Sequence, residues 1–278
     1  MRQPEYLQVG AVRTRHIIQG EGPPVVLLHG IGRSLDDWTA TLPALSNGYR
    51  VHALDMIGFG LTDKPDVEYS LAGLARFVRH YLQAVGEPRP VILIGNSLGG
   101  AVAQQFAVMY PDHSRRLVLV NSAGFGRDVT LALRLLAVPG VGERLMAPSP
   151  RASARAVESL FHDPRFATPE RRAHAHLLAT QPNRATSFLR VARVLGGWRG
   201  VHPAWRDTLT RTLAGQRLPT LIVWGAQDRI LSARHLQHAR AVYPHAQTHL
   251  FAQTGHLPQI ERAEAFNALT LRFLGDAT

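Results

Sequence analysis

The sequence contains no cysteine, and this absence alone excludes several kinds of chemistry. Disulfide bonds, thiolate metal ligands and a cysteine nucleophile all require a residue that the chain does not have. Residues 1–20 lack the apolar stretch and the small-residue cleavage site of a secretory signal peptide. No apolar run approaches the roughly 18 residues that a membrane-spanning helix needs. We therefore expect a soluble protein of the cytoplasm without a membrane span.

Lysine is almost absent as well, because Lys64 is the only one in the chain. Arginine therefore provides nearly all of the basic side chains, and the net charge is +11. A basic surface can bind nucleic acid or anionic lipid, but a codon bias toward arginine would produce the same composition. The arginines form no long run. We expect a small-molecule substrate and no nucleic-acid partner, and we leave open whether the chain forms a homodimer.

The remaining composition is that of a folded globular chain. Of the 278 residues, 45% are hydrophobic and 18% are charged, which suffices for a sizeable core and argues against disorder. This length fits one large domain or a domain that carries an insertion.

Short apolar segments rich in β-branched residues alternate with amphipathic segments along most of the chain. The apolar segments predict strands at residues 23–30, 49–54, 90–95, 115–120, 218–225 and 246–251. The amphipathic segments predict helices at residues 71–86, 98–110, 232–242 and 261–274. Residues 6–18 are typical of an opening β-hairpin. Strands that are apolar throughout and alternate with helices indicate an α/β fold whose parallel sheet is covered on both faces.

One long segment interrupts this alternation. Residues 126–205 contain no convincing strand, and four amphipathic stretches within them are separated by proline and glycine. We expect these stretches to form helices inserted between two strands of the sheet, as a lid over the carboxyl ends of the strands. The predicted organisation is thus a core formed by residues 1–125 and 206–278 and a helical cap formed by residues 126–205.

A serine lies within a tight frame of glycines where a predicted strand meets a predicted helix. The stretch Gly95-Asn96-Ser97-Leu98-Gly99 matches the pattern G-x-S-x-G in the strand–turn–helix context that gives the pattern its meaning. Glycines two residues before and two residues after the serine let strand and helix approach without Cβ clashes. Because the turn lifts the hydroxyl clear of the sheet edge, Ser97 is predicted to be a catalytic nucleophile.

A serine hydroxyl needs a general base, and the base needs an acid that orients it. Of the 14 histidines, His256 stands out because it follows the last predicted strand and precedes the last predicted helix. For the acid, Asp228 lies just beyond the end of the preceding strand. Asp55 also ends a strand, but its glycine-rich surroundings indicate a turn that caps and packs. We predict His256 as the base and Asp228 as the acid.

An oxyanion formed in the reaction needs backbone N–H donors. One donor is predicted at Leu98, at the N-terminus of the helix that follows the serine, where the helix dipole favours negative charge. The second donor is predicted at Ile31, in the loop after the first parallel strand. His29 in the same loop is expected to brace it.

The lid is rich in leucine, valine, phenylalanine and alanine, which favours an apolar acyl group of small to medium size. Large apolar side chains in and near the lid are predicted to line the substrate pocket, with ordinary packing as the alternative for each. These residues are Trp38, Phe125, Met146, Phe161, Phe188 and Trp198, and Leu257 joins them because it follows the predicted catalytic histidine.

Together these residues resemble the α/β-hydrolase superfamily over essentially the whole chain. The stretches LLHGIG, DMIGFGLTDKP, GNSLGG, WGAQDRI and GHLPQIERAEAFNALTLRFL look like the landmarks of that family in their usual order. The chain order Ser97, Asp228, His256 is also that of the fold. The resemblance implies an eight-stranded, mostly parallel sheet flanked by helices, with a helical cap inserted after the sixth strand. It also implies a Ser-His-Asp triad that works without a metal or a cofactor.

Within the superfamily the sequence is similar to two groups of serine hydrolases. The leading prediction is a carboxylesterase. The alternative is a hydrolase that cleaves a C–C bond in meta-cleavage products, which are vinylogous diketone acids, because GNSLGG and ERAEAFN resemble those enzymes. The chain departs from them in its oxyanion loop, HGIGRSLDDW, and at Leu257, where they usually have tryptophan. They also need a cap arginine to hold the carboxylate, and the sequence does not single one out. A binding protein that retains this fold without turnover is a third possibility.

Overall fold

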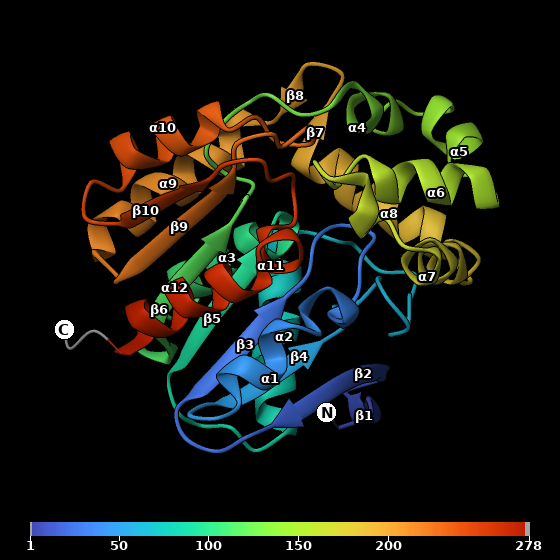
Figure 1. Cartoon of the computed structure of the whole chain (residues 1–278). Coiled ribbons are helices and arrows are strands. Elements are labelled where there is room, and N and C mark those ends of the chain that lie inside the picture. Colours follow the sequence, from blue (N-terminus) through green and yellow to red (C-terminus); the bar gives the residue numbers. More distant parts are fainter. Residues whose placement is uncertain (1, 276–278) are drawn as a thin grey trace.

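A computed structural model describes residues 2–275 and shows a twisted sheet with helices on both faces (Figure 1). Within this range, eight strands follow one another across the sheet in the order β1-β2-β4-β3-β5-β6-β9-β10. Their bounds are β1 (Glu5–Val9), β2 (Val12–Gln19), β3 (Pro24–Leu28), β4 (Arg50–Leu54), β5 (Val91–Asn96), β6 (Ser114–Val120), β9 (Thr220–Gly225) and β10 (Gln247–Phe251). β2 pairs antiparallel with β1 and with β4, and every later pair is parallel. The predicted eight-stranded, mostly parallel sheet is confirmed.

The central strands are apolar throughout because both faces of the sheet are covered. All of β3 is buried, and its alternate residues enter different cores: Val26 and Leu28 pack on one face, Val25 and Leu27 on the other. The first face is covered by α2 (Leu71–Ala84), α3 (Leu98–Met109), α9 (Pro203–Gln216) and α10 (Arg234–Val242), and the second by α1 (Thr41–Leu45) and α12 (Ala263–Gly275).

The longer helices begin and end close to the predicted residues. In α2, the Ser70 hydroxyl accepts a hydrogen bond from the Gly73 N–H at 3.1 Å, and Gly86 follows the helix with a φ of 65°. These are the usual N-terminal and C-terminal signals of a helix. The predicted closing helix is divided into α11 (Pro258–Glu261) and α12. None of the helices that the structure describes is long and apolar enough to cross a membrane.

Between β6 and β9 lies a group of helices beyond the carboxyl ends of the strands, at the upper right of Figure 1. They are α4 (Leu131–Leu136), α5 (Val141–Leu145), α6 (Pro150–Glu158), α7 (Pro169–Ala179) and α8 (Arg184–Leu195), followed by a hairpin of β7 (Gly196–Gly197) and β8 (Gly200–Val201). We call residues 126–202 the inserted segment. The sequence predicted four helices here and missed α5 and the hairpin, because such short elements show no hydrophobic period.

Short 3₁₀ helices complete the fold at η1 (Leu35–Trp38), η2 (Pro111–His113) and η3 (Pro164–Phe166).

Polar contacts hold the inserted segment against loops of the core. Nε2 of His174, on α7, lies 2.9 Å from Ser34 Oγ and 3.2 Å from Asp36 Oδ2, both close to η1. The Ser187 hydroxyl, on α8, donates to Tyr69 Oη at 3.1 Å. Helices α7 and α8 are therefore fixed to the loops that follow β3 and β4.

Candidate active site

The turn between β5 and α3 holds Ser97 in a strained backbone conformation. Its φ of 56° and ψ of −115° lie outside the regions that most residues favour, and such a conformation costs on the order of 1–3 kcal/mol. Gly95 and Gly99 make the turn feasible. A Cβ on Gly95 would collide with the backbone of Gly99, and a Cβ on Gly99 would collide with the backbone of Leu28. The helix can therefore begin directly against two strands.

The imidazole of His256 and the carboxylate of Asp228 are joined by a hydrogen bond of 2.7 Å from Nδ1 to Oδ2. Asp228 follows β9, and His256 lies between β10 and α11. Both side chains are almost fully buried, which shields the bond from water. Because a carboxylate only accepts, we assign the proton to Nδ1 and the lone pair to Nε2. The predicted base and acid are thus in contact, and the second imidazole nitrogen can accept a proton.

A hydrogen bond also connects the serine turn to the histidine loop. The Asn96 amide nitrogen donates to the His256 carbonyl at 3.0 Å and to the Val120 carbonyl at 3.1 Å. The main chain of His256 is therefore held beside the residue that precedes Ser97, and Ser97 and His256 line the same cavity. The sequence analysis used Asn96 only as a mark of resemblance and did not assign it this contact.

Asn121 is a site residue that the sequence analysis missed. It follows β6, has a φ of 42°, and its amide nitrogen donates to Asp228 Oδ2 at 2.6 Å. The other carboxylate oxygen, Oδ1, accepts from the N–H groups of Ile230 at 2.7 Å and Leu231 at 3.1 Å. Four donors, including His256, therefore hold the carboxylate in one orientation. The signal that the sequence offered was a polar residue directly after a predicted strand.

Glu261 attaches the histidine loop to the inserted segment. Its side chain is buried, with 6% of the residue exposed. One carboxylate oxygen accepts from the Gly255 N–H at 2.5 Å, and the other accepts from the N–H groups of His162 at 2.8 Å and Asp163 at 3.0 Å. Next to this contact, the His256 N–H donates to the Leu160 carbonyl at 2.7 Å. The loop that carries His256 is thus tied to the residues between α6 and η3.

Replacing Glu261 with glutamine is expected to lower the free energy of unfolding by about 1–3 kcal/mol. An amide has one oxygen, so its NH₂ group would face either the Gly255 N–H or the paired N–H groups, and those donors would lose their acceptor. Urea denaturation followed by circular dichroism measures the change. Glu264, which is exposed on α12, provides the matched control, and Glu264→Gln should change stability by less than about 0.5 kcal/mol. Equal losses in the two variants would contradict this account of Glu261.

The residues of the two predicted N–H donors, Ile31 and Leu98, lie close to Ser97. Leu98 is the first residue of α3, so its N–H has no acceptor within the helix. Ile31 belongs to the loop after β3, which passes so close to the serine that a Cβ on Gly30 would lie 3.3 Å from the Ser97 Cβ. Both residues line a pocket together with Ser97. The two N–H groups can therefore donate to the oxyanion that forms when Ser97 Oγ bonds to a carbonyl carbon.

His29, in the loop after β3, has a structural role. His29 Nδ1 lies 2.8 Å from the Gly30 carbonyl, and its Nε2 accepts from the Met56 N–H at 3.0 Å, so it braces the loop as expected. Burial lowers the pKa of His29, which is consistent with a neutral ring. Within residues 2–275, no group of three or more histidine and carboxylate side chains is arranged to hold a metal ion.

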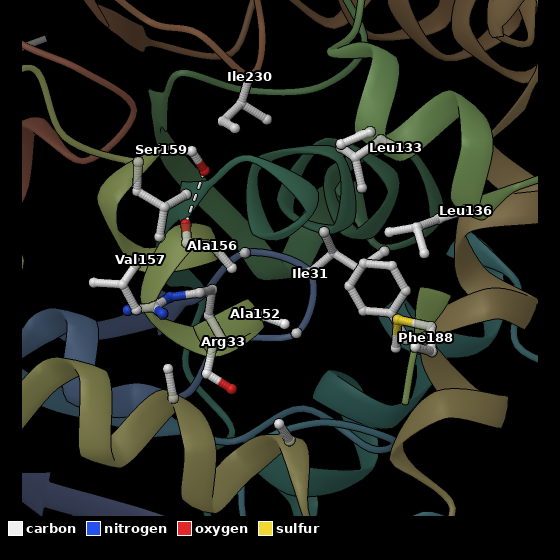
Figure 2. A pocket seen from close by; sticks show the side chains of 18 of the residues that line it. Ile31, Arg33, Leu133, Leu136, Ala152, Ala156, Val157, Ser159, Phe188 and Ile230 are labelled. Carbon is white, nitrogen blue, oxygen red and sulfur yellow. Dashed lines mark hydrogen bonds between the residues drawn. The ribbon is translucent and has the colours of Figure 1, made fainter. Parts of the chain in front are cut away.

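Two hollows adjoin Ser97 and share part of their lining. The main cavity has a volume of about 280 Å³ and lies between the serine turn, His256 and helices α4 to α8 of the inserted segment. Figure 2 shows aliphatic side chains such as Leu133 and Leu136 facing it, with Phe188 on one side. The side pocket has a volume of about 70 Å³ and extends toward the β7–β8 hairpin. Apart from Ser97, its lining is apolar or glycine.

Three of the seven residues predicted to contact the substrate line the main cavity. They are Met146, which follows α5, Phe188 on α8, and Leu257, which follows the catalytic histidine candidate. Met146 and Phe188 are nearly buried, with 6% of each exposed. These side chains contribute apolar surface to the main cavity.

For the other four residues the prediction was wrong. Trp38 is fully buried in the core on the face of the sheet that α1 and α12 cover, where it packs against Phe266. Phe125 packs edge-on against Tyr243 in the core on the face that α2, α3, α9 and α10 cover, with ring centroids 5.3 Å apart. The remaining two are Phe161, which packs in a small separate cluster with Phe166, and Trp198, which is 58% exposed on the β7–β8 hairpin.

Two arginines reach the main cavity in different electrostatic states. Arg33 is neutralised by Asp37, which it contacts through both Nε and a terminal nitrogen at 2.9 and 2.5 Å. Arg184, at the start of α8, has no ion pair within the part of the chain that the structure describes. Its Nε is buried without a partner, and a terminal nitrogen lies 3.5 Å from the Met146 sulfur. Burial lowers the pKa of Arg184. Such a group favours an anion in the cavity.

A family model described as alpha/beta hydrolase fold matches residues 23–263, and the chain belongs to this family. The 2-hydroxymuconate semialdehyde hydrolase of Pseudomonas sp. (strain CF600) is 30% identical, covering 96% of this chain and 92% of the relative. A dihydrolipoyllysine-residue acetyltransferase component of an acetoin cleaving system from Cupriavidus necator is 32% identical, covering 98% of this chain and 69% of the relative.

A solved structure of a hydrolase is similar to this chain over its whole length. The meta-cleavage product hydrolase from Pseudomonas fluorescens, complexed with acetates, superposes with a TM-score of 0.83 and 30% identity. The match covers 100% of this chain and 98% of that one. The family and the two hydrolases among these relatives support a hydrolase.

Proposed function

We propose that the protein is a serine hydrolase that cleaves carboxylic esters of small to medium apolar acyl groups through an acyl-enzyme. The observation that carries the proposal is the 2.7 Å hydrogen bond between His256 Nδ1 and Asp228 Oδ2, on an imidazole that lines the same cavity as Ser97. The apolar lining of the main cavity and of the side pocket supports an apolar substrate.

The reaction begins when His256 Nε2 takes the proton from Ser97 as Oγ attacks the ester carbon. The N–H groups of Ile31 and Leu98 bind the resulting oxyanion, and loss of one such donor typically costs about 10²- to 10³-fold in rate. His256 then gives the proton to the alcohol oxygen, the C–O bond breaks, and the acyl group stays on Ser97. Water, deprotonated by His256, then attacks the acyl carbon. The bond between this carbon and Ser97 Oγ breaks, the proton passes from His256 to Oγ, and the acid leaves. Asp228 holds the tautomer and stabilises the imidazolium.

The position of His256 assigns the two hollows to the two parts of the substrate. The alcohol must leave on the side of the imidazole, because His256 protonates it. His256 lines the main cavity and not the side pocket, so the main cavity takes the alcohol and the side pocket takes the acyl chain. The side pocket, at about 70 Å³, is much smaller than the main cavity, at about 280 Å³, so we expect it to take a short acyl chain.

Activity on esters of a common alcohol is therefore expected to peak between acetate and butanoate and to fall at least tenfold by octanoate. Ala192 lines the side pocket, and Ala192→Leu should lower the ratio of kcat/KM for butanoate to that for acetate by about tenfold or more. Ala156 lines only the main cavity, and Ala156→Leu is the matched control, which should leave this ratio within about twofold. If Ala156→Leu shortens the preferred acyl chain and Ala192→Leu does not, the assignment of the two hollows is reversed.

We also propose that residues 126–205 act as a cap over the site. Helices of the inserted segment supply most of the walls of the main cavity, from Thr130 to Phe188. A cover of this kind excludes water and strengthens the electrostatic interactions around the reacting atoms.

A second candidate is hydrolysis of a C–C bond in a vinylogous diketone acid. Arg184 supports it, because this arginine borders the cavity assigned to the leaving group and has no carboxylate partner within the described residues. The 2-hydroxymuconate semialdehyde hydrolase and the meta-cleavage product hydrolase among the relatives support it as well. In this reaction the same serine would attack the ketone, and Arg184 would hold the carboxylate of the departing dienoate.

The two candidates are separated by the substitution Arg184→Gln. If the substrate carries a carboxylate in the main cavity, kcat/KM for the diketone acid should fall about a hundredfold relative to that for a neutral ester. Arg190 lies on the same helix and pairs with Asp66, so Arg190→Gln is the control and should leave the ratio unchanged. The loss of absorbance of the diketone measures its cleavage. If the wild type does not cleave it, the second candidate is rejected and the ester hydrolase stands.

A further inference from the structure

The main cavity opens to the outside through a rim of exposed apolar residues. Six residues both line the cavity and are exposed, namely Ala132, Leu145, Ala147, Pro148, Ala152 and Ala156. Two further apolar residues stand beside them on α4 and α5: Leu131 is 58% exposed and Val141 is 38% exposed. We call these eight residues the mouth rim. Figure 1 shows α4, α5 and α6 at the outer edge of the molecule.

Uncompensated positive charge lies next to the mouth rim. Arg144 lies on α5 beside Leu145, and Arg151 and Arg155 lie one turn apart on α6, each directly before Ala152 or Ala156; all three arginines are exposed. None of them forms an ion pair within residues 2–275. Most acidic side chains of the inserted segment are paired with other arginines, as Asp128–Arg134, Glu143–Arg193, Glu158–Arg172 and Asp163–Arg165. Arg144, Arg151 and Arg155 therefore leave a local excess of positive charge where the cavity opens.

We propose that the mouth rim docks on an anionic lipid surface. Binding at a bilayer interface requires exposed apolar side chains that enter the acyl boundary and cations that meet the headgroups, and the rim supplies both side by side. Nucleic acid would use the arginines but would leave Leu131, Val141 and Leu145 in water. A second copy of the chain would bring the same arginines against one another, which is unfavourable. Anionic lipid is the one partner that matches both properties.

Docking in this orientation would face the cavity opening toward the lipid. An apolar ester dissolved in the bilayer could then enter between α5 and α6 without crossing water, and could reach Ser97 through the main cavity. This inference goes beyond the proposed function, because vesicle binding does not depend on whether Ser97 is an active nucleophile.

The test is flotation of the full chain with vesicles of phosphatidylcholine alone or with 30% phosphatidylglycerol. We expect binding only to the anionic vesicles and release at high salt, as screening predicts. Each arginine at an anionic surface contributes about fivefold in affinity, so Arg144→Gln, Arg151→Gln and Arg155→Gln together should weaken binding about a hundredfold. The matched control removes three exposed arginines of the core, with Arg76→Gln, Arg115→Gln and Arg211→Gln, and should bind within threefold of the wild type. The pair Leu131→Ser and Val141→Ser should weaken binding about tenfold at unchanged charge.

Several results would overturn the proposal. Equal losses in the two triple variants would show that only net charge matters, and full binding by the serine pair would show that the apolar rim does not enter the lipid. Tighter binding to duplex DNA, or a dimer in sedimentation velocity that the serine pair abolishes, would assign the surface to another partner. Ser97→Ala should bind vesicles as the wild type does, so a failure of the hydrolase proposal is seen separately from a failure of docking.

Discussion

Replacing Ser97 with alanine is expected to lower kcat for a short-chain ester by about 10⁵- to 10⁶-fold. The hydroxyl is the atom that forms the covalent intermediate, and no neighbouring group can substitute for it at the end of β5. What remains would come from the N–H groups of Ile31 and Leu98 acting on a bound ester. The fold should be unaffected, because alanine retains the Cβ atom at this position. Gly95 and Gly99 still allow the strained turn. Steady-state release of the alcohol, measured with thoroughly purified protein, gives the result.

Ser122 provides a matched control for this loss. It is also buried, lies two residues beyond the end of the neighbouring strand β6, and its hydroxyl donates to the Ala123 carbonyl at 2.8 Å. Ser122→Ala should retain kcat within about tenfold of the wild type. If Ser97→Ala retained more than one per cent of wild-type kcat, the covalent mechanism would be wrong.

Replacing Asp228 with asparagine is expected to lower kcat/KM by about 10⁴-fold. The amide oxygen of asparagine would be held by the N–H groups of Ile230 and Leu231, which now bond to Oδ1. The NH₂ group would then face His256 Nδ1, which would have to accept. The imidazole proton would move to Nε2. This nitrogen would then have no free lone pair with which to take the proton from Ser97.

The control for the Asp228 variant removes a carboxylate outside the site. Asp207 is half-exposed on α9 and pairs with Arg206, and Asp207→Asn should leave kcat/KM within about twofold. Asp228→Asn should also keep the fold, because asparagine has the same shape as aspartate. Three of the four groups that bond to this side chain can still form a hydrogen bond or can rotate to form one. A loss of less than a hundredfold for Asp228→Asn would show that the tautomer of His256 is not set by this carboxylate.

The fold could be predicted because its physical causes act over short stretches of sequence. Strand β3 lies between two covered faces, so every residue of it is apolar, and α2 has a capping serine and a terminal glycine. Elements of two to five residues, such as α5 and the β7–β8 hairpin, bury too little to show a period, and their positions follow from neighbours that the sequence does not reveal.

The candidate site was predictable where topology decides position. Ser97, Asp228 and His256 each follow a strand, and the carboxyl ends of parallel strands meet at one edge of a sheet. Asn121 and Glu261 were not assigned, because they act through hydrogen bonds to groups about 100 residues away in the chain. Such partners leave no local pattern.

The aromatic residues show why the pocket lining was harder to predict. Residue size and proximity to the cap suggested contact with substrate, but orientation decides it. Trp38 lies in η1, whose buried face turns toward α12, whereas Trp198 lies in the turn of a hairpin and faces outward. Phe188 and Met146 differ from them only in lying on the inner side of the inserted segment, which requires knowledge of how its helices pack.

The most direct test of the account is covalent labelling by an alkyl fluorophosphonate, with the adduct located by peptide mass spectrometry. We expect one phosphonyl group per chain, attached to the peptide that contains Ser97. The label should be absent from Ser97→Ala and should form far more slowly on Asp228→Asn. Ester turnover by folded wild-type protein that is not labelled, or a label on another residue with Ser97 unmodified, would contradict the proposal that Ser97 is the nucleophile.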